Sequence, residues 1–253
     1  MVIAAEYVHR EGHTVRLLKG DEEAEAFSPL SLLVLPYPAT RDGHTVAGTS
    51  LPFSSLPLPP ALPLFGGRVP APWREGRRSG DAEDNERYLC ENAYLTAAAG
   101  VATALRAGER AFFRVTAGVV GYGRIGKETA RMLRALGAAV TVYVRREAAR
   151  EEAAKDGFRA ALLGEGVRVP EDLLFGTAPA PAENLASLTV SPDALIYDLG
   201  GGLPSALKTS AGEDVGVLPL RGAPGVFAPR AAGEIYGGAI LDFIRHLERR
   251  TTA

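Results

Sequence analysis

The sequence has very few of the side chains that build disulfides and metal centres. Cys90 is the only cysteine, and there are 4 histidines among 253 residues. A single thiol excludes an intramolecular disulfide and a multi-thiolate metal site, and it suits a reducing cytoplasm, which is where we expect the protein. There is no G-x-S-x-G motif, no Walker loop and no metal-ligand spacing, so the sequence favours none of the enzyme classes that these motifs mark.

An excess of one charge and long apolar runs are also missing. Lys and Arg number 28 against 30 for Asp and Glu, a formal net charge of −2. The protein should therefore have no general affinity for nucleic acid or an anionic membrane surface. No apolar run is long enough to cross a bilayer, and Glu6 and His9 interrupt the apolar residues at the N-terminus. We therefore expect neither a membrane span nor a signal peptide.

Glycine, in contrast, is abundant and well placed between residues 115 and 146. A buried strand is predicted at 115–120, an amphipathic helix follows, Gly137 ends that helix, and a second strand is predicted at 139–144. Between the first strand and the helix lie Gly121, Gly123 and Gly126, at G-x-G-x-x-G spacing.

In such a β-α-β unit each glycine has a physical role. The first allows a tight turn, the second lets the backbone approach a pyrophosphate, and the third lets the helix pack closely on the strand. The helix N-terminus then favours the anion. We predict dinucleotide binding, and the alternative is a glycine-rich turn that binds nothing.

The chain beyond this unit keeps alternating between strand and helix or loop. Strands are predicted at 158–162, 173–176, 194–197 and 215–219, with a helix at 148–156. This alternation predicts an α/β protein with a Rossmann-type doubly wound parallel sheet.

The N-terminal third predicts a second, smaller α/β domain. We expect a helix, strands at 15–18 and 32–35, and a solvated turn or short helix at Glu22, Glu23 and Glu25. Residues 51–75 contain seven prolines, which disfavour helix and central strand, so this segment is either a loop or lid or a plain linker. Residues 74–84 are charged and expected to be exposed.

Two long helices are predicted at 84–107 and 228–249, one on each side of the Rossmann unit. We therefore assign residues 1–95 together with 230–253 to a substrate-side α/β domain. Residues 96–229 form the cofactor-binding Rossmann domain.

The end of the second strand of the Rossmann unit bears on the choice of cofactor. An acidic residue at this point would bind the ribose 2′-hydroxyl of NAD, but Arg145 and Arg146 stand there. Two guanidinium groups would instead pair with the 2′-phosphate of NADP. We favour NADP, and the alternative is a solvated, charged strand end.

Candidates for binding a small substrate come from two helices and one strand end. Arg230 lies in the first turn of the final helix, where the helix dipole also favours an anion, and it could grip a carboxylate. Its alternative is an ion pair with Glu234. Asn92 and Thr96 share a helix face and could complete the pocket, although ordinary helix polarity explains them too. Asp198 could steady the loop that follows its strand.

Histidine gives little support for one common dehydrogenase chemistry. Oxidation of 2-hydroxy acids of the lactate or glycerate type uses a histidine after the last strands, and only His246 lies late enough. Its place near the end of the final helix is typical of a surface residue, which counts against that chemistry.

Several blocks in order give the chain a family resemblance over most of its length. The loop Gly121-Tyr122-Gly123-Arg124-Ile125-Gly126 matches a G-x-G-R-x-G pattern. Asn92 to Thr96 matches N-x-x-P-T with Leu95 for proline, Thr177-Ala178-Pro179 resembles N-T-x-P, and Asp198-Leu199 matches D-L-A-S. Residues 222–233 are similar to G-x-P-G-x-x-A-P-K-T-A-G, with Arg230 for lysine. Together they resemble the A subunit of dipicolinate synthase.

This resemblance implies an NADP-dependent oxidoreductase that forms dipicolinate in sporulating bacteria from dihydrodipicolinate or its hydrated precursor. It also implies a small dicarboxylate substrate, a partner in the form of a flavoprotein-like B subunit, and cofactor contacts from the glycine loop and residues 177–179. A homo-oligomer is left open. The departures from the family pattern, such as Gly201 in place of serine, fall on the substrate side. A non-catalytic nucleotide-binding or regulatory subunit therefore stays an alternative.

Overall fold

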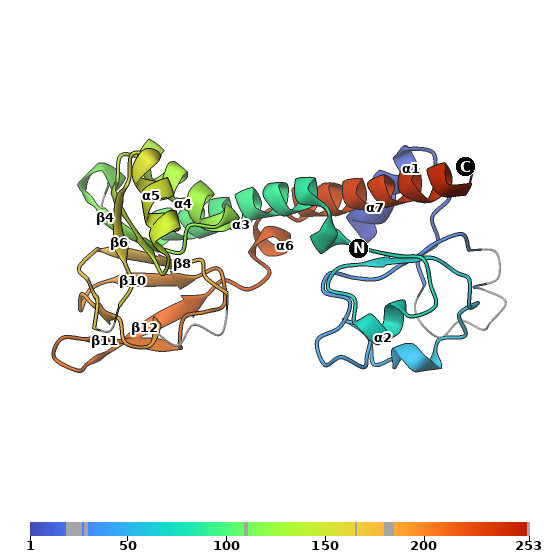
Figure 1. Ribbon diagram of the computed structural model, residues 1–253, viewed down its shortest axis with the longest axis horizontal. Helices are drawn as coiled ribbons and strands as arrows, with labels where there is room; N and C mark the ends of the chain where they lie inside the picture. The colour runs from blue at the N-terminus through green and yellow to red at the C-terminus, as the bar shows by residue number, and fades with distance from the viewer. Residues whose placement is uncertain (19–26, 28–29, 109–110, 165, 180–184, 252–253) are drawn as a thin grey trace. The chain divides into compact units, whose positions relative to one another are not determined.

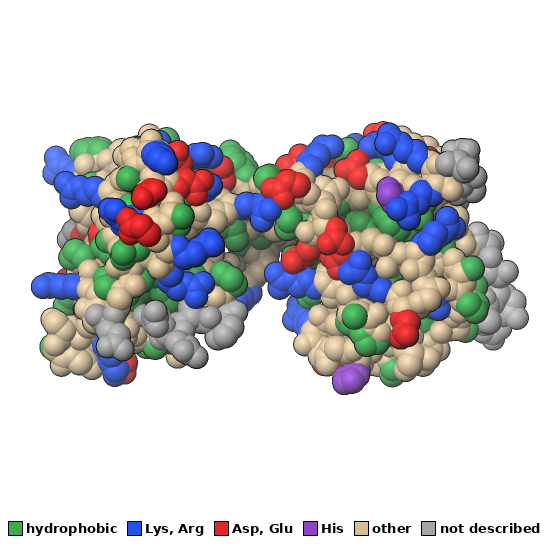
Figure 2. All heavy atoms as spheres, in the orientation of Figure 1, with side chains coloured by type: hydrophobic (Ala, Val, Ile, Leu, Met, Phe, Trp, Pro, Cys, Tyr) green, Lys and Arg blue, Asp and Glu red, His purple; other side chains and the backbone are tan. Residues whose placement is uncertain are grey.

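The chain folds into two compact units, of which unit 1 is built from two separate parts of the sequence. The computed structural model describes all residues except 19–26, 28–29, 109–110, 165, 180–184 and 252–253 (Figure 1). Unit 1 comprises Met1–Glu91 and Pro229–Ala253, and unit 2 comprises Asn92–Ala228. Helix α3 (Glu86–Ala107) contains the boundary and contributes to both units. On the face of each unit that Figure 2 shows, basic and acidic side chains are intermixed, in keeping with the near-balanced charge.

Unit 2 is organised by a parallel sheet with a recognisable strand order. Six of its strands run in the order β6-β5-β4-β8-β10-β12. Counted along the chain, this is the 3-2-1-4-5-6 order of a Rossmann fold. The α/β class and the Rossmann-type sheet predicted from sequence are confirmed. The strands are β4 (Thr116–Val120), β5 (Ala139–Val144), β6 (Arg159–Leu162), β8 (Leu173–Gly176), β10 (Leu195–Asp198) and β12 (Asp214–Pro219).

The two faces of this sheet bury different partners. Successive residues of a strand point to opposite faces, so Val119 packs on one side and Val120 on the other. Helices α3, α4 (Arg124–Ala135) and α5 (Glu147–Lys155) contribute Ala104, Leu133 and Ala153 to the first core. The opposite face packs against the described residues of the 185–190 segment and its neighbours, including the fully buried Leu185 and Leu188.

Three short strands that the sequence did not predict extend the sheet beyond β12. They are β11 (Ala206–Thr209), antiparallel to β12, followed by β9 (Thr189–Val190) and β7 (Arg168–Val169). Two of them are only two residues long, which is too short for an apolar period to reveal.

The glycine-rich unit forms as its sequence pattern predicts. Strand β4 pairs with β5 in parallel over five residue pairs, from Thr116 with Ala139 to Val120 with Tyr143. Gly137 adopts a φ of 92° directly after the C-cap residue of α4, and the next N–H, of Ala138, donates to Leu133 O at 3.0 Å. This left-handed residue closes the helix and turns the chain into β5.

Unit 1 contains a smaller parallel sheet with helices on one face. The sheet has the order β1-β2-β3, with β1 (Leu33–Val34), β2 (Leu64–Gly66) and β3 (Ser79–Asp81). Helices α1 (Val2–Arg10) and α7 (Pro229–Thr251) lie side by side (Figure 1). Phe65 packs on the helix side with Tyr236 and Ile240. Leu64 packs on the opposite side with Leu33 and Trp73, where Trp73 stacks on Phe53 with ring centroids 4.2 Å apart.

The proline-rich segment at 51–75 is part of the folded core, so its interpretation as a linker is wrong. Strand β2 lies between Pro63 and Pro70 and is the central strand of its sheet. A short helix α2 (Ala71–Arg74) follows, with a proline in its first turn. Pro63 and Pro70 lie outside the strand and Pro72 lies in the first turn of α2, so none of them interrupts a ladder hydrogen bond. Burial of Leu62, Leu64 and Val69 stabilises the segment.

Two other expectations for this unit also need correction. Residues 15–18 form no strand, and Val15 and Leu17 are exposed, so the local apolar run lacks a pairing partner in the described chain. The charged segment at 74–84 is not exposed throughout, because Asp81 and Ala82 are buried at the end of β3. The expected turn at Glu22, Glu23 and Glu25 lies outside the described residues.

Candidate cofactor-binding site

Two of the three fingerprint glycines are required by the fold itself. Gly121 has a φ of 99°, and a Cβ built on it would lie 2.8 Å from Thr177 Oγ1. A Cβ on Gly126 would lie 2.2 Å from the backbone oxygen of Gly121. Helix α4 can therefore approach the β4 turn only with glycine at both positions.

Gly123 differs from its two neighbours because it faces open space. A Cβ on this residue would meet nothing within 4 Å, so packing does not explain the glycine. Gly123 is the N-cap of α4, and no side chain caps this end of the helix. The first helical hydrogen bond runs from Lys127 N–H to Gly123 O at 2.9 Å, which leaves earlier N–H groups such as that of Ile125 for another acceptor. The site has the room and the donors for a pyrophosphate.

The side chain of Tyr122 points into the core beneath this loop. It is 6% exposed, its ring packs edge-on against Phe158, and its hydroxyl donates to Asp156 Oδ2 at 2.6 Å. Burial and this hydrogen bond raise the pKa of Tyr122. Ile125 also packs against the core, whereas Arg124 is exposed. The loop therefore presents mainly backbone at its open side.

Thr177 fastens the glycine turn to the neighbouring strand β8. Its hydroxyl donates to Val120 O at 2.9 Å and lies 3.3 Å from Gly121 O, and its N–H donates to Val120 O at 2.8 Å. The hydroxyl is thus used within the protein. Ala178 and the exposed Pro179 continue along the same edge, and Pro179 forms a bridge with Gly201.

Asp198 links three segments at the carboxyl end of β10. Its side chain is 2% exposed, Oδ1 accepts the N–H of Gly201 at 2.8 Å, and Oδ2 lies 3.5 Å from Arg221 Nη2. A Cβ on Gly201 would lie 2.0 Å from Arg221 Nη1, so glycine at this position lets the guanidinium approach. Asp198 therefore holds the 200–202 turn, and its role beside a bound cofactor remains a prediction.

Arg221 is a charged residue of this edge that the sequence analysis missed. It follows β12, which pairs with β10, and Leu220 N–H donates to Asp198 O at 2.9 Å. The signal that could have found it is its position just after the last parallel strand, since the carboxyl ends of neighbouring parallel strands meet at one edge.

Arg145 and Arg146 follow β5 at the same edge, and both are exposed. Among the residues that the structure describes, neither guanidinium has an ion-pair or hydrogen-bond partner in the protein. The adjacent Glu147 pairs instead with Arg150, one turn further along α5. Two cations without internal partners lie where the ribose of a bound dinucleotide is expected.

The candidate substrate residues lie on other elements. Thr96 is buried and its hydroxyl donates to Asn92 O at 2.8 Å, while Asn92 is partly exposed. Both belong to unit 2. Arg230 belongs to unit 1, three residues beyond a short helix α6 (Ala223–Phe227), and its ligand role remains a prediction.

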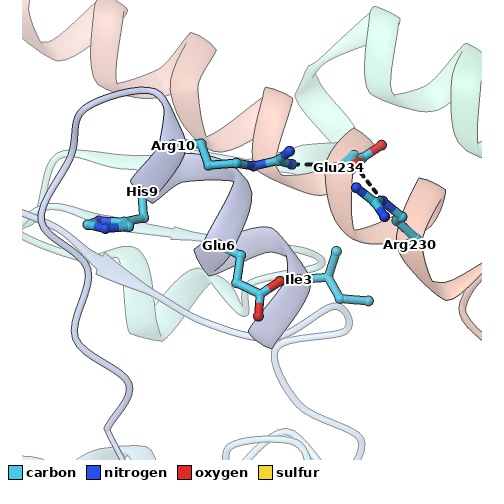
Figure 3. A pocket seen from close by; sticks show the side chains of 6 residues that line it. All are labelled: Ile3, Glu6, His9, Arg10, Arg230 and Glu234. Carbon is cyan, nitrogen blue, oxygen red and sulfur yellow. Dashed lines mark hydrogen bonds and ion pairs between the residues drawn. The ribbon is translucent and has the colours of Figure 1, made fainter.

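Arg230 takes part in the ion pair that was its alternative role. Its Nε lies 3.2 Å from Glu234 Oε1, and Arg10 Nη2 lies 3.4 Å from the same oxygen. The two arginines flank Glu234 beside an open cavity of about 540 Å³ (Figure 3). The remaining lining residues are Ile3, Glu6 and His9 of α1.

Other kinds of site find no support in the described part of the chain. No helix there is long and apolar enough to span a membrane, and no group of three or more His, Cys, Asp or Glu side chains could hold a metal ion. His246 is exposed on α7.

Comparison with known proteins finds a family model that matches part of unit 2. Residues 96–184 match the family model of the D-isomer specific 2-hydroxyacid dehydrogenase, NAD binding domain. This match supports a nicotinamide cofactor and an NAD(P)-dependent oxidoreductase. No curated protein matches the sequence.

Solved structures extend the similarity to most of the chain. Dipicolinate synthase, A chain, from Bacillus subtilis superposes with a TM-score of 0.68 at 23% identity, covering 88% of this chain and 80% of that one. The A subunit of dipicolinate synthase from Bacillus halodurans gives 0.71 at 18% identity, covering 96% and 93%. A transhydrogenase from Sinorhizobium meliloti gives 0.52 at 18% identity, covering 77% and 70%. The resemblance to the A subunit of dipicolinate synthase is confirmed at the level of the fold.

Proposed function

We propose that the protein is an NADP-dependent oxidoreductase that oxidises dihydrodipicolinate, or its hydrated precursor, to dipicolinate in the cytoplasm of a sporulating bacterium. The observation that carries the cofactor half of the proposal is the open Gly123 beside a helix N-terminus that no side chain caps. At the end of β5, Arg145 and Arg146 add two guanidiniums that have no partner among the described residues. The substrate half is supported by the fold shared with two structures of the dipicolinate synthase A subunit and by the sequence motifs.

Different residues of unit 2 would contact different parts of the cofactor. The N–H groups at the start of α4 would hold the pyrophosphate, and Arg145 and Arg146 would pair with the 2′-phosphate. Bound NADP⁺ would supply a hydride acceptor at C4 of its nicotinamide. Ala178 and Pro179 lie at the β8 end of the same edge and would flank that ring, while Thr177 and Asp198 hold the backbone in place.

Substrate contacts are assigned to three polar residues. Asn92 has an amide free of partners in the described chain, Thr96 positions the helix turn beside it, and Arg230 would bind a carboxylate after releasing Glu234. Oxidation removes a hydride and a proton from dihydrodipicolinate, with the proton leaving to water or a base, and the product is aromatic. A flavoprotein-like B subunit is the proposed partner.

A second candidate function is a non-catalytic nucleotide-binding or regulatory subunit of the same fold. The favouring observation is that the hydroxyl of Thr96 and the carboxylate of Asp198 are both engaged inside the protein. Both groups already have partners inside the protein, whereas the cofactor groups of unit 2 remain available.

One kinetic experiment separates these functions. The full chain is mixed with NADP⁺ and fresh dihydrodipicolinate, with and without a B subunit, and the absorbance of NADPH is followed, with NAD⁺ as the cofactor control. We expect NADPH to form, and faster than NADH. Binding of NADPH without turnover in either mixture would favour the regulatory subunit. Failure to bind either cofactor would exclude both candidates.

A further inference from the structure

A cluster of three side chains lies at the carboxyl edge of the small sheet in unit 1. Tyr37 follows β1, Arg68 follows β2 and Glu83 follows β3, so three parallel strands deliver them to one edge. The hydroxyl of Tyr37 donates to Glu83 Oε1 at 2.6 Å, and Arg68 Nε donates to the same oxygen at 2.7 Å. In open α/β sheets this edge is where ligands bind.

A buried carboxylate fixes the backbone beneath the cluster. Asp81, the last residue of β3, is 7% exposed and accepts three N–H groups. These come from Arg68 at 3.0 Å, Val69 at 2.7 Å and Glu83 at 2.9 Å. One side chain therefore sets the positions of both the cationic and the anionic residue.

Arg68 occupies a backbone conformation that disfavours an arginine. Its φ of 54° is the one positive φ of a non-glycine residue in the described chain. Glycine or asparagine adopts this conformation at a lower cost, and an exposed ion pair returns little stability. The side chain is 66% exposed, so burial does not explain the arginine either. Strain of this kind is typical of functional positions.

The ring of Tyr37 packs closely against the same edge of the sheet. A Cβ on Gly67 would lie 1.8 Å from Tyr37 Cδ2, so the ring rests directly on the glycine backbone. The rings of Tyr88 and Tyr236 lie 5.6 and 6.3 Å away, centroid to centroid. Burial and the hydrogen bond to Glu83 raise the pKa of Tyr37 to about 12, so its hydroxyl remains a donor at neutral pH.

The guanidinium keeps one edge available for a ligand. Nε donates to Glu83 and the guanidinium also interacts with the hydroxyl of Tyr37, whereas Nη1 and Nη2 donate no hydrogen bond of normal geometry to any acceptor in the described part of the protein. Two parallel N–H groups with this arrangement match a carboxylate.

We propose that Arg68 binds a carboxylate group of a small ligand through Nη1 and Nη2, with Glu83 and Tyr37 holding the guanidinium in orientation. The inference rests on the proposed function only in the choice of dipicolinate as the dicarboxylate. It adds an anion-binding residue on a sheet edge that the family motifs do not include.

The test is the affinity of the full chain for dipicolinate, measured by calorimetry for the wild type and for Arg68→Gly. Glycine accepts the positive φ, so this variant should unfold at the same or a higher temperature, followed by the fluorescence of Trp73, the only tryptophan. The dissociation constant for dipicolinate should rise at least about tenfold, the loss of one charge-assisted hydrogen bond, and that for NADPH should not change.

The matched control is Arg87→Ala on α3. Arg87 pairs through Nε with Glu91 at 2.9 Å and is 65% exposed, close to the 2.7 Å and 66% of the Arg68 pair, and alanine suits its helix. Its dipicolinate affinity should equal that of the wild type. Arg68→Lys keeps the charge but not the paired donors and should bind more weakly than the wild type.

Three results would bear on the proposals separately. Unchanged dipicolinate affinity in Arg68→Gly, or no dipicolinate binding by a wild type that binds NADPH, would overturn the role of Arg68 and leave the cofactor assignment standing. Loss of dipicolinate binding in Arg68→Gly alone, in a protein that never forms NADPH, would support Arg68 and contradict the proposed oxidation.

Discussion

The carboxyl edges of the two sheets are built in opposite ways. In unit 2 the centre of the edge offers mostly backbone, because Thr177 and Asp198 engage their polar atoms inside the protein and Gly123 faces open space, while the exposed cations Arg145, Arg146 and Arg221 follow neighbouring strands. In unit 1 the edge offers charged and aromatic side chains, with Arg68 and Glu83 held by the buried Asp81. Both edges depend on an aspartate that is the last residue of its strand.

The two aspartates nevertheless differ in what they connect. Asp81 accepts three backbone N–H groups from the segments after β2 and β3, whereas Asp198 accepts one and adds an ion pair with Arg221. A backbone edge suits a ligand whose phosphates and ribose are always the same. A side-chain edge can be changed residue by residue, which suits a site that selects one small molecule.

The largest effect should come from removing the aspartate that holds more bonds. Asp81→Ala leaves three N–H groups without their charged acceptor, so unit 1 should lose about 3–5 kcal/mol of stability. Trp73 lies in unit 1, so its fluorescence during urea unfolding reports this loss directly. Asp198→Ala is the control, and it should move the Trp73 transition little. Equal shifts of that transition in both variants would contradict the claim that Asp81, and not Asp198, stabilises unit 1.

The next effect concerns Arg145 and Arg146 of unit 2. Replacing Arg145 and Arg146 with alanine should weaken NADPH binding by about 1.5–3 kcal/mol for each charge-assisted hydrogen bond lost, and should change NADH binding little. The wild-type preference should also fall as salt increases, because the contact is ionic. Arg150→Ala is a matched control, since Arg150 lies on α5 and already pairs with Glu147. Equal affinity of the wild type for NADPH and NADH would refute the assignment.

The smallest effect distinguishes the folding glycine from the ligand glycine. Gly126→Ala forces a Cβ against the backbone oxygen of Gly121 and should cost about 1–3 kcal/mol of stability, measured by circular dichroism during urea unfolding. Gly123→Ala meets no atom and should leave stability unchanged while weakening NADPH binding. If both variants unfold like the wild type, the tight packing of α4 on the β4 turn is not the reason for Gly126.

The difference between the edges also decides what could be predicted from sequence. The glycine loop, the helix after it and Gly137 lie within a short stretch, so local periodicity and spacing were sufficient to find them. Arg221 and Asp198 meet only because β12 pairs with β10, and Tyr37, Arg68 and Glu83 meet only because β1, β2 and β3 are neighbours. No spacing rule connects such residues before the topology is known.

The prediction for the proline-rich segment was wrong for a different physical reason. Proline limits the backbone locally, and local reasoning therefore predicted a loop or linker at 51–75. The strand at Leu64–Gly66 fits between two prolines and is stabilised by burial on both faces, with Leu64 and Phe65 in different cores. Tertiary contacts of this kind override propensity, and a three-residue strand carries too few residues to show a period.

The interrupted sequence of unit 1 has a consequence for the order of events on the ribosome. Its core needs Tyr236 and Ile240 of α7, and Tyr236 donates to Leu35 O at 2.8 Å, yet all of unit 2 is synthesised before α7 appears. Domains generally fold in the order in which their complete sequences leave the ribosome. The Rossmann unit should therefore fold first, and the N-terminal segment should stay unfolded until α7 has been synthesised. A chain ending at Ala228 should still bind NADPH while Trp73 emits as in an unfolded protein. A native Trp73 spectrum in that chain would contradict this order.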